Sequence, residues 1–204
     1  MGYPFGHPCD LRQAGAGDTA GCAGLSVLHG KWLVYQFCAA TTAARARRSS
    51  SSPFGLDPNL PDLACDALAL ACAARGWSLS QTRILLAAHG SARGPKAAEA
   101  AEAFATAMRD RLPGTTLATG YVEEDPRIAT TARVFEDTAP ARPSLCLPFF
   151  AQAGEHVRDD IPDALADAGF GGDTLPVLGA LPQVPQLIAN ALNKALSGPG
   201  VTST

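Results

Sequence analysis

The sequence predicts an α/β protein built around a four-stranded parallel sheet with helices on both faces. Short apolar runs that do not alternate with polar residues recur along residues 81–198, and an amphipathic helical pattern follows each run. Strands of this kind are buried on both faces, and their alternation with helices is typical of parallel sheets. An internal repeat further indicates that an incomplete copy of the same unit precedes this complete domain.

The first strand and helix of the complete domain are predicted at residues 83–89 and 95–112. The run RILLAAH is short, apolar and bounded by a Gly-Ser turn, as a buried strand is. The helix has Pro95 at its start, large apolar residues at a spacing of four, and a Pro-Gly pair directly after its end.

Three further strand–helix pairs follow the same pattern. Strands are predicted at residues 115–122, 144–150 and 173–179, and helices at residues 126–138, 155–168 and 182–196. The class of fold follows from this alternation, whereas the order of the strands in the sheet does not.

The internal repeat links two helical segments. Residues 55–68, GLDPNLPDLACDAL, align with residues 179–192, GALPQVPQLIANAL, at an offset of 124, and six of the 14 positions are identical. Two histidines, His89 and His156, serve as markers for the rest of the alignment. At the same offset Trp32 aligns with His156, and the counterpart of His89 would fall before residue 1. We therefore expect the sequence to begin partway into its first repeat and to hold one active site. A short variant, a truncated chain and a misassigned start or reading frame are all compatible with this.

The repeat divides the chain into four parts. Residues 1–52 are predicted to be an irregular, incomplete first repeat, and residues 53–80 its closing helix and a linker. Residues 81–198 form the complete domain, and residues 199–204 a tail. An arginine cluster at residues 45–48 stands beside a serine run, which is typical of a solvated linker rather than a nucleic-acid patch.

Composition and charge exclude several classes of protein. The net charge is −3, so no overall basic field attracts nucleic acid or anionic lipid. No apolar run approaches the roughly 20 residues that span a bilayer, and the MGYPFGHPCD start lacks a signal-peptide pattern. None of the six cysteines forms a C-x-x-C pair, which argues against zinc-ribbon and thioredoxin-like proteins. We expect buried, reduced thiols in a cytoplasmic protein with no nucleic-acid or membrane partner.

Polar residues follow three consecutive predicted strands. His89 ends the first strand, Glu123 and Glu124 follow the second, and His156 comes shortly after the third. Ligands of parallel sheets bind at the carboxyl ends of the strands, and two imidazoles with a carboxylate suit a divalent metal ion or proton transfer near neutral pH. Each residue alone has an ordinary structural explanation, but their convergence on one sheet edge favours a site.

Other patterns in the sequence give less support for a functional site. Asp159 and Asp160 are explained by the dipole of the helix whose first turn they occupy. The segment AHGSAR is not a G-x-S-x-G nucleophile elbow, and neither a G-x-G-x-x-G nor a Walker motif follows a strand. No H-E-x-x-H helix is present. These absences argue against a serine hydrolase, a nucleotide-binding enzyme and a zinc protease.

Three segments carry a family resemblance. LLAAHGSARGP, GYVEEDP and LPFFAQAGEHVRDDIP, in this order and spacing, resemble the class II (CbiX-type) chelatases, the cobalt or iron chelatases of cobalamin and sirohaem synthesis. The resemblance implies a chelatase-like fold, and it accounts for the repeat because longer members contain two fused halves. Many members read HGSR, whereas Ala92 here separates Ser91 from Arg93.

The resemblance also implies roles for individual residues. The family's two tetrapyrrole-facing, metal-handling histidines map onto His89 and His156, and its acidic residue after the second strand maps best onto Glu123, one position before Glu124. These three residues would both hold the metal and carry the catalysis. The metal, Co²⁺ or else Fe²⁺ or Ni²⁺, would be a substrate inserted into sirohydrochlorin, so no permanent cofactor is expected. A homodimer could supply the second wall of the cleft.

Sirohydrochlorin is a polycarboxylate, so its site should offer cations and backbone N–H groups. Arg93 and Lys96 are suitably placed after His89, as is the start of the helix near Pro95. Ser91 is a further substrate-side residue, although shaping the turn explains it equally well. Ordinary solvated charges explain Arg93 and Lys96 as well as substrate binding does.

Two other functions stay open at the level of sequence. The chain could be a non-catalytic metal- or tetrapyrrole-binding protein with a degenerate first half. It could also be a phosphotransfer enzyme that uses His89, but such an enzyme needs a cradle of arginines around the histidine, and residue 88 is alanine.

Overall fold

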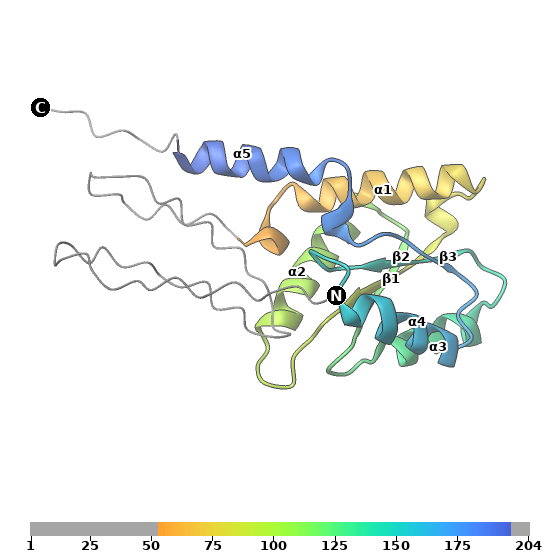
Figure 1. Cartoon of the computed structure of the whole chain (residues 1–204). Coiled ribbons are helices and arrows are strands. Elements are labelled where there is room, and N and C mark those ends of the chain that lie inside the picture. The colour runs from red at the N-terminus through yellow and green to blue at the C-terminus, as the bar shows by residue number, and fades with distance from the viewer. Residues whose placement is uncertain (1–52, 197–204) are drawn as a thin grey trace, which may run out of the picture. The chain divides into compact units, whose positions relative to one another are not determined.

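A computed structural model describes residues 53–196 of the chain. The predictions for residues 1–52 and for the C-terminal tail concern residues outside this described range. Figure 1 shows a sheet with helices α1 (Leu60–Ala74) and α2 (Lys96–Arg111) on one face and α3 (Ile128–Thr138) and α4 (Ile161–Asp167) on the other. A fifth helix, α5, spans Val184–Leu196.

The sheet has four parallel strands, which confirms the predicted fold class. Their order is β2-β1-β3-β4, and their bounds are Arg83–Ala88 (β1), Thr116–Tyr121 (β2), Ser144–Pro148 (β3) and Asp173–Thr174 (β4). Every residue of β1 and β3 is buried, as continuous apolar runs predict.

Side chains of β1 alternate between two cores, one on each face of the sheet. Ile84 and Leu86 pack in the core that contains α1 and α2, and Leu85 and Ala87 pack in the core that contains α3 and α4. The strand period of two residues produces this division. Because β1 is the central strand, its carboxyl end lies between those of β2 and β3.

The fourth strand is shorter than the predicted residues 173–179. Only Asp173 and Thr174 pair as a strand with β3, although the Leu175 N–H still donates to the Cys146 carbonyl at 2.9 Å. Pro176 follows Leu175, and the chain then enters a short 3₁₀ turn, Leu178–Ala180.

The two repeated segments have the same local structure. A 3₁₀ turn at Phe54–Leu56 precedes α1, and the turn at Leu178–Ala180 precedes α5. The starts of the two turns, and those of the two helices, are each separated by the offset of 124 that relates the sequences. However, α1 belongs to the same core as β1 and α2, so residues 53–80 pack with the complete domain that follows them.

The two repeated helices differ in burial. Ala64, Leu68 and Cys72 of α1 are buried, whereas their repeat counterparts Ile188, Leu192 and Leu196 of α5 are 44%, 39% and 65% exposed. From Ile188 onward, the positions that α1 buries are therefore exposed on α5 within the described residues, whereas Val184 is buried, as is its counterpart Leu60.

Three cysteines lie in the described range, and all three are free thiols: Cys65, Cys72 and Cys146. Burial raises the pKa of Cys146 to about 12 and that of Cys65 to about 11. The Cys65 and Cys146 thiols therefore stay protonated near neutral pH. None of the helices between residues 53 and 196 is long and apolar enough to cross a membrane.

Arg83, at the start of β1, ties three segments together from a buried position. Its Nε donates to Ser144 Oγ at 2.9 Å, its Nη2 to the Arg142 carbonyl at 2.9 Å, and its Nη1 to the Phe135 carbonyl. Glu136 balances the charge, with 3.6 Å between Arg83 Nη2 and Glu136 Oε1. The Arg83 residue is 2% exposed, so these partners replace the water that its guanidinium loses on folding.

We predict that Arg83→Met lowers the free energy of unfolding by about 2–4 kcal/mol, because it removes three hydrogen bonds in a buried environment and takes the positive charge away from the Glu136 carboxylate. The matched control is Arg133→Met. Arg133 pairs with Asp167 at 2.6 Å, but both side chains are at least half exposed, so this loss should stay within about 1 kcal/mol. Urea unfolding measures both, and equal losses would contradict the role of Arg83.

Candidate metal-handling site

Parallel pairing between β1 and β2 continues beyond the ends of the two strands. The Val122 N–H donates to the Ala88 carbonyl at 3.0 Å, and the Glu123 N–H donates to the His89 carbonyl at 2.9 Å. These two bonds fix the backbone of Glu123 beside that of His89. The carboxylate predicted at the second strand therefore reaches the histidine predicted at the first.

His89, Glu123 and His156 meet at the carboxyl edge of the sheet. One ligand atom from each residue lies within 4.8 Å of the other two. His89 Nε2 is 3.8 Å from Glu123 Oε1, and the two imidazole rings meet edge to face with 4.6 Å between their centroids. The side chains are 14% (His89), 45% (Glu123) and 33% (His156) exposed, so the cluster is open to solvent on one side.

The His89 ring is oriented by the backbone of its own turn. Its Nδ1 lies 2.8 Å from the Gly90 carbonyl oxygen. Because a carbonyl only accepts hydrogen bonds, this contact places the hydrogen on Nδ1 and the lone pair on Nε2. That lone pair lies on the atom nearest Glu123.

Glu124 has a different place from its neighbour Glu123. Its Oε1 accepts the Ser91 N–H at 2.9 Å, and its carboxylate lies against Gly90, where a Cβ would come within 2.7 Å of Oε1. Glu124 thus braces the turn that carries His89. Spacing in the sequence could not separate the two glutamates, because they are adjacent in a connection that has no strand periodicity.

His156 begins a five-residue π-helical turn, His156–Asp160, that leads directly into α4. Its Nδ1 contacts Asp160 Oδ2, four residues later. The predicted continuous helix over residues 155–168 is therefore a π turn followed by a shorter α-helix. Single π-helical turns occur often at functional sites.

The predicted substrate-side residues lie on the connection from β1 to α2. Arg93 and Lys96 are exposed, and no ion pair involves either of them within the described range. Ser91 Oγ accepts the Arg93 N–H at 3.2 Å, which is the turn-shaping role that the sequence allowed. Lys96 is the first residue of α2.

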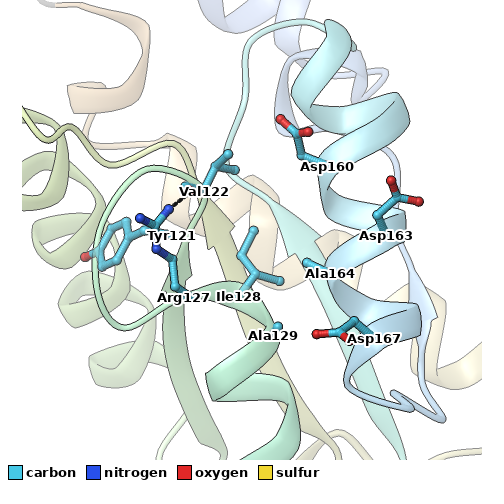
Figure 2. Close-up of a pocket in the computed structure, with 9 residues that line it drawn as sticks. All are labelled: Tyr121, Val122, Arg127, Ile128, Ala129, Asp160, Asp163, Ala164 and Asp167. Atoms are coloured by element: carbon cyan, nitrogen blue, oxygen red, sulfur yellow. Dashed lines mark hydrogen bonds between the residues drawn. The ribbon is translucent and has the colours of Figure 1, made fainter.

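A pocket of about 590 Å³ adjoins the cluster and lies between the β2–α3 connection and α4. In Figure 2, Asp160, Asp163 and Asp167 line its α4 side, across from Arg127 and Ile128. Asp160 contacts both this pocket and His156. No sequence pattern predicted this pocket, although the helical spacing of its three aspartates is visible in the sequence.

We predict that Gly90→Ala destabilises the protein by at least about 1–2 kcal/mol, because Gly90 has a φ of +69° and a Cβ there collides with the Glu124 carboxylate. Gly94→Ala is the matched control, since a Cβ at Gly94 meets nothing within 4 Å. That control should stay within about 0.5 kcal/mol of wild type. Thermal unfolding compares the two variants, and equal midpoints would show that the turn does not need glycine.

Comparison with known proteins identifies one family and several solved structures. The CbiX family model matches residues 83–195, a range that contains His89, Glu123 and His156. A solved CbiX, described as the terminal enzyme for siroheme biosynthesis in denitrifying bacteria, is 45% identical, with a TM-score of 0.63 over 71% of this chain and 61% of its own. Among curated proteins, none matches the chain.

Two more distant structures share the fold. A multi-domain protein of Deinococcus radiodurans with structural similarity to chelatases is 20% identical, with a TM-score of 0.55 over 73% of this chain and 31% of its own. SirB from Bacillus subtilis, solved with Fe³⁺, is 13% identical, with a TM-score of 0.52 over 67% of this chain and 54% of its own. The chain thus spans less than two thirds of each of these three structures. The family model matches more than half of the chain, and the chain belongs to the CbiX family.

Proposed function

We propose that this protein is a chelatase that inserts a divalent metal ion into sirohydrochlorin, with Co²⁺ as the first candidate and Fe²⁺ and Ni²⁺ as the alternatives. The observation that carries the proposal is the cluster of His89, Glu123 and His156, whose ligand atoms lie within 4.8 Å of one another. Membership of the CbiX family supports it. The similar CbiX acts in siroheme biosynthesis, which keeps Fe²⁺ among the candidates.

The cluster suits a metal ion that passes through rather than one that stays. Two imidazoles and one carboxylate can replace part of the water around a divalent ion, and Glu123 offsets part of its charge. The partial exposure of all three side chains leaves a side of the ion open to an incoming ligand. The metal is therefore a substrate, and the protein needs no resident cofactor for this reaction.

Metal insertion also releases two protons from the pyrrole N–H groups of the macrocycle. An imidazole with its lone pair on Nε2 can accept such a proton. The Glu123 carboxylate, 3.8 Å from His89 Nε2, would stabilise the imidazolium that forms. We propose that His89 and His156 share metal delivery and proton abstraction, with Glu123 as a further ligand or acceptor.

The tetrapyrrole would lie toward the β1–α2 connection rather than in the pocket beside α4. Three aspartates line that pocket, and they would repel the carboxylates of sirohydrochlorin. Arg93, Lys96 and the backbone N–H groups that open α2 offer the opposite charge. The homodimer remains a prediction, and the exposed apolar face of α5 is a surface on which two copies could associate.

We predict that His89→Ala and His156→Ala each slow cobalt insertion into sirohydrochlorin by at least about 100-fold, because each removes a ligand and a proton acceptor. The absorbance change of the tetrapyrrole measures the rate. Wild-type turnover in both variants would refute the two-histidine mechanism. A His156→Ala enzyme with half the activity would point to a second working site, and stoichiometric binding by wild-type protein without turnover would favour the binding-only function.

We predict that Arg93→Gln and Lys96→Gln each raise the KM for sirohydrochlorin about twofold to fivefold, since an exposed charge pair contributes up to about 1 kcal/mol. Their kcat should change little, because neither residue belongs to the metal cluster. Arg75→Gln is the control: Arg75 pairs with Asp173 at 2.6 Å, where β4 begins. A KM that changes equally in all three variants would show only a general effect of net charge.

A further inference from the structure

We propose that Asp160 is the positioning residue of His156: its carboxylate accepts the Nδ1–H of His156 and so holds the imidazole with the Nε2 lone pair available to the metal. This inference rests on the proposed function, because it takes His156 as a metal-handling residue. The sequence alone explained Asp160 by the dipole of its helix, and the contact with His156 gives it a second and more specific role.

The polarity of the contact follows from its chemistry. Asp160 Oδ2 contacts His156 Nδ1, and an ionised carboxylate can only accept a hydrogen bond. The hydrogen must therefore be on Nδ1, which leaves the lone pair of the neutral ring on Nε2. Histidines that bind metals commonly donate their other ring N–H to a carboxylate in this way, which fixes the tautomer and the orientation of the ring.

The backbone brings the two side chains together. The Ile161 N–H donates to the His156 carbonyl and closes the π-helical turn His156–Asp160 over five residues. His156 and Asp160 stand at its first and last positions, and side chains four residues apart on a helical turn are neighbours. Asp160 occupies the N-cap position of α4 but makes no capping hydrogen bond with its side chain. Its carboxylate is committed to the imidazole instead.

The two histidines are therefore oriented by different means. His89 is 14% exposed, and its Nδ1 lies against the backbone carbonyl of Gly90. His156 is 33% exposed, and the residues just before it, Gln152–Glu155, are all exposed. The partner of its Nδ1 is a side chain. A single substitution at Asp160 can consequently remove the orientation of His156 and leave that of His89 unchanged.

The test compares Asp160→Asn with Asp159→Asn. Both variants remove one negative charge from adjacent exposed positions, but only Asp160 contacts His156. An asparagine at position 160 can accept from Nδ1–H or donate to a bare Nδ1, so it permits both tautomers. Asp160→Glu keeps a carboxylate and should recover part of the effect.

Two measurements on the protein without tetrapyrrole give the result. The first is ¹⁵N NMR of the imidazoles in metal-free full-length protein, at a pH well above the usual imidazole pKa, with His156→Gln to assign the signals. Wild type and Asp159→Asn should show the Nδ1–H tautomer of His156, and Asp160→Asn a mixture of both. The second is a titration with Co²⁺ alone, in which Asp160→Asn should raise the Kd about 10-fold to 100-fold and Asp159→Asn should leave it unchanged.

Three outcomes would overturn the role of Asp160: an Nε2–H tautomer of His156 in the wild-type protein, equal weakening of Co²⁺ binding in both variants, or no change in either measurement for Asp160→Asn. The first of these needs no variant, so it remains decisive even where a substitution impairs folding. Because neither measurement uses sirohydrochlorin, a protein that behaves as predicted here but fails to insert metal would contradict only the proposed function.

Discussion

Parallel pairing of β1 with both of its neighbours is the constraint on which the site depends. Arg83 stands opposite Thr116 of β2 and opposite Ser144 of β3, so three strands run in one direction and their carboxyl ends meet at one edge. A register shift of one residue would turn the side chains of a strand to the other face, which the two cores of the sheet oppose. The bond from the Glu123 N–H to the His89 carbonyl extends this register into the site.

The site is assembled from three segments that are far apart in the sequence, and each is held locally by a different device. Glu124 and the left-handed Gly90 shape the turn of His89, the continued β ladder fixes Glu123, and a π-helical turn presents His156. Carboxylates therefore serve two purposes here. Glu123 belongs to the cluster with the two imidazoles, whereas Glu124 braces the turn of His89 and Asp160 contacts the ring of His156.

Strand periodicity and the alternation with helices were sufficient to predict the parallel sheet, its helices and the placement of His89, the Glu123–Glu124 pair and His156 at one sheet edge. The sequence did not predict the order β2-β1-β3-β4, which makes the strands that precede these residues neighbours. The sequence also could not predict in which direction each side chain of a loop points. Glu123 and Glu124 are adjacent, and only the folded turn separates their roles. The shortened β4, the π turn at His156 and the exposure of Ile188 on α5 likewise depend on tertiary contacts that no local pattern encodes.

The central claim is that His89 and His156 bind one metal ion together. X-ray absorption spectroscopy of the Co²⁺-loaded protein tests it most directly, because imidazole ligands give a distinctive outer-shell scattering that can be counted. We expect two imidazoles on the cobalt in wild type and one in each of His89→Ala and His156→Ala. Cobalt surrounded by oxygen ligands alone, or an imidazole count that neither substitution lowers, would contradict it.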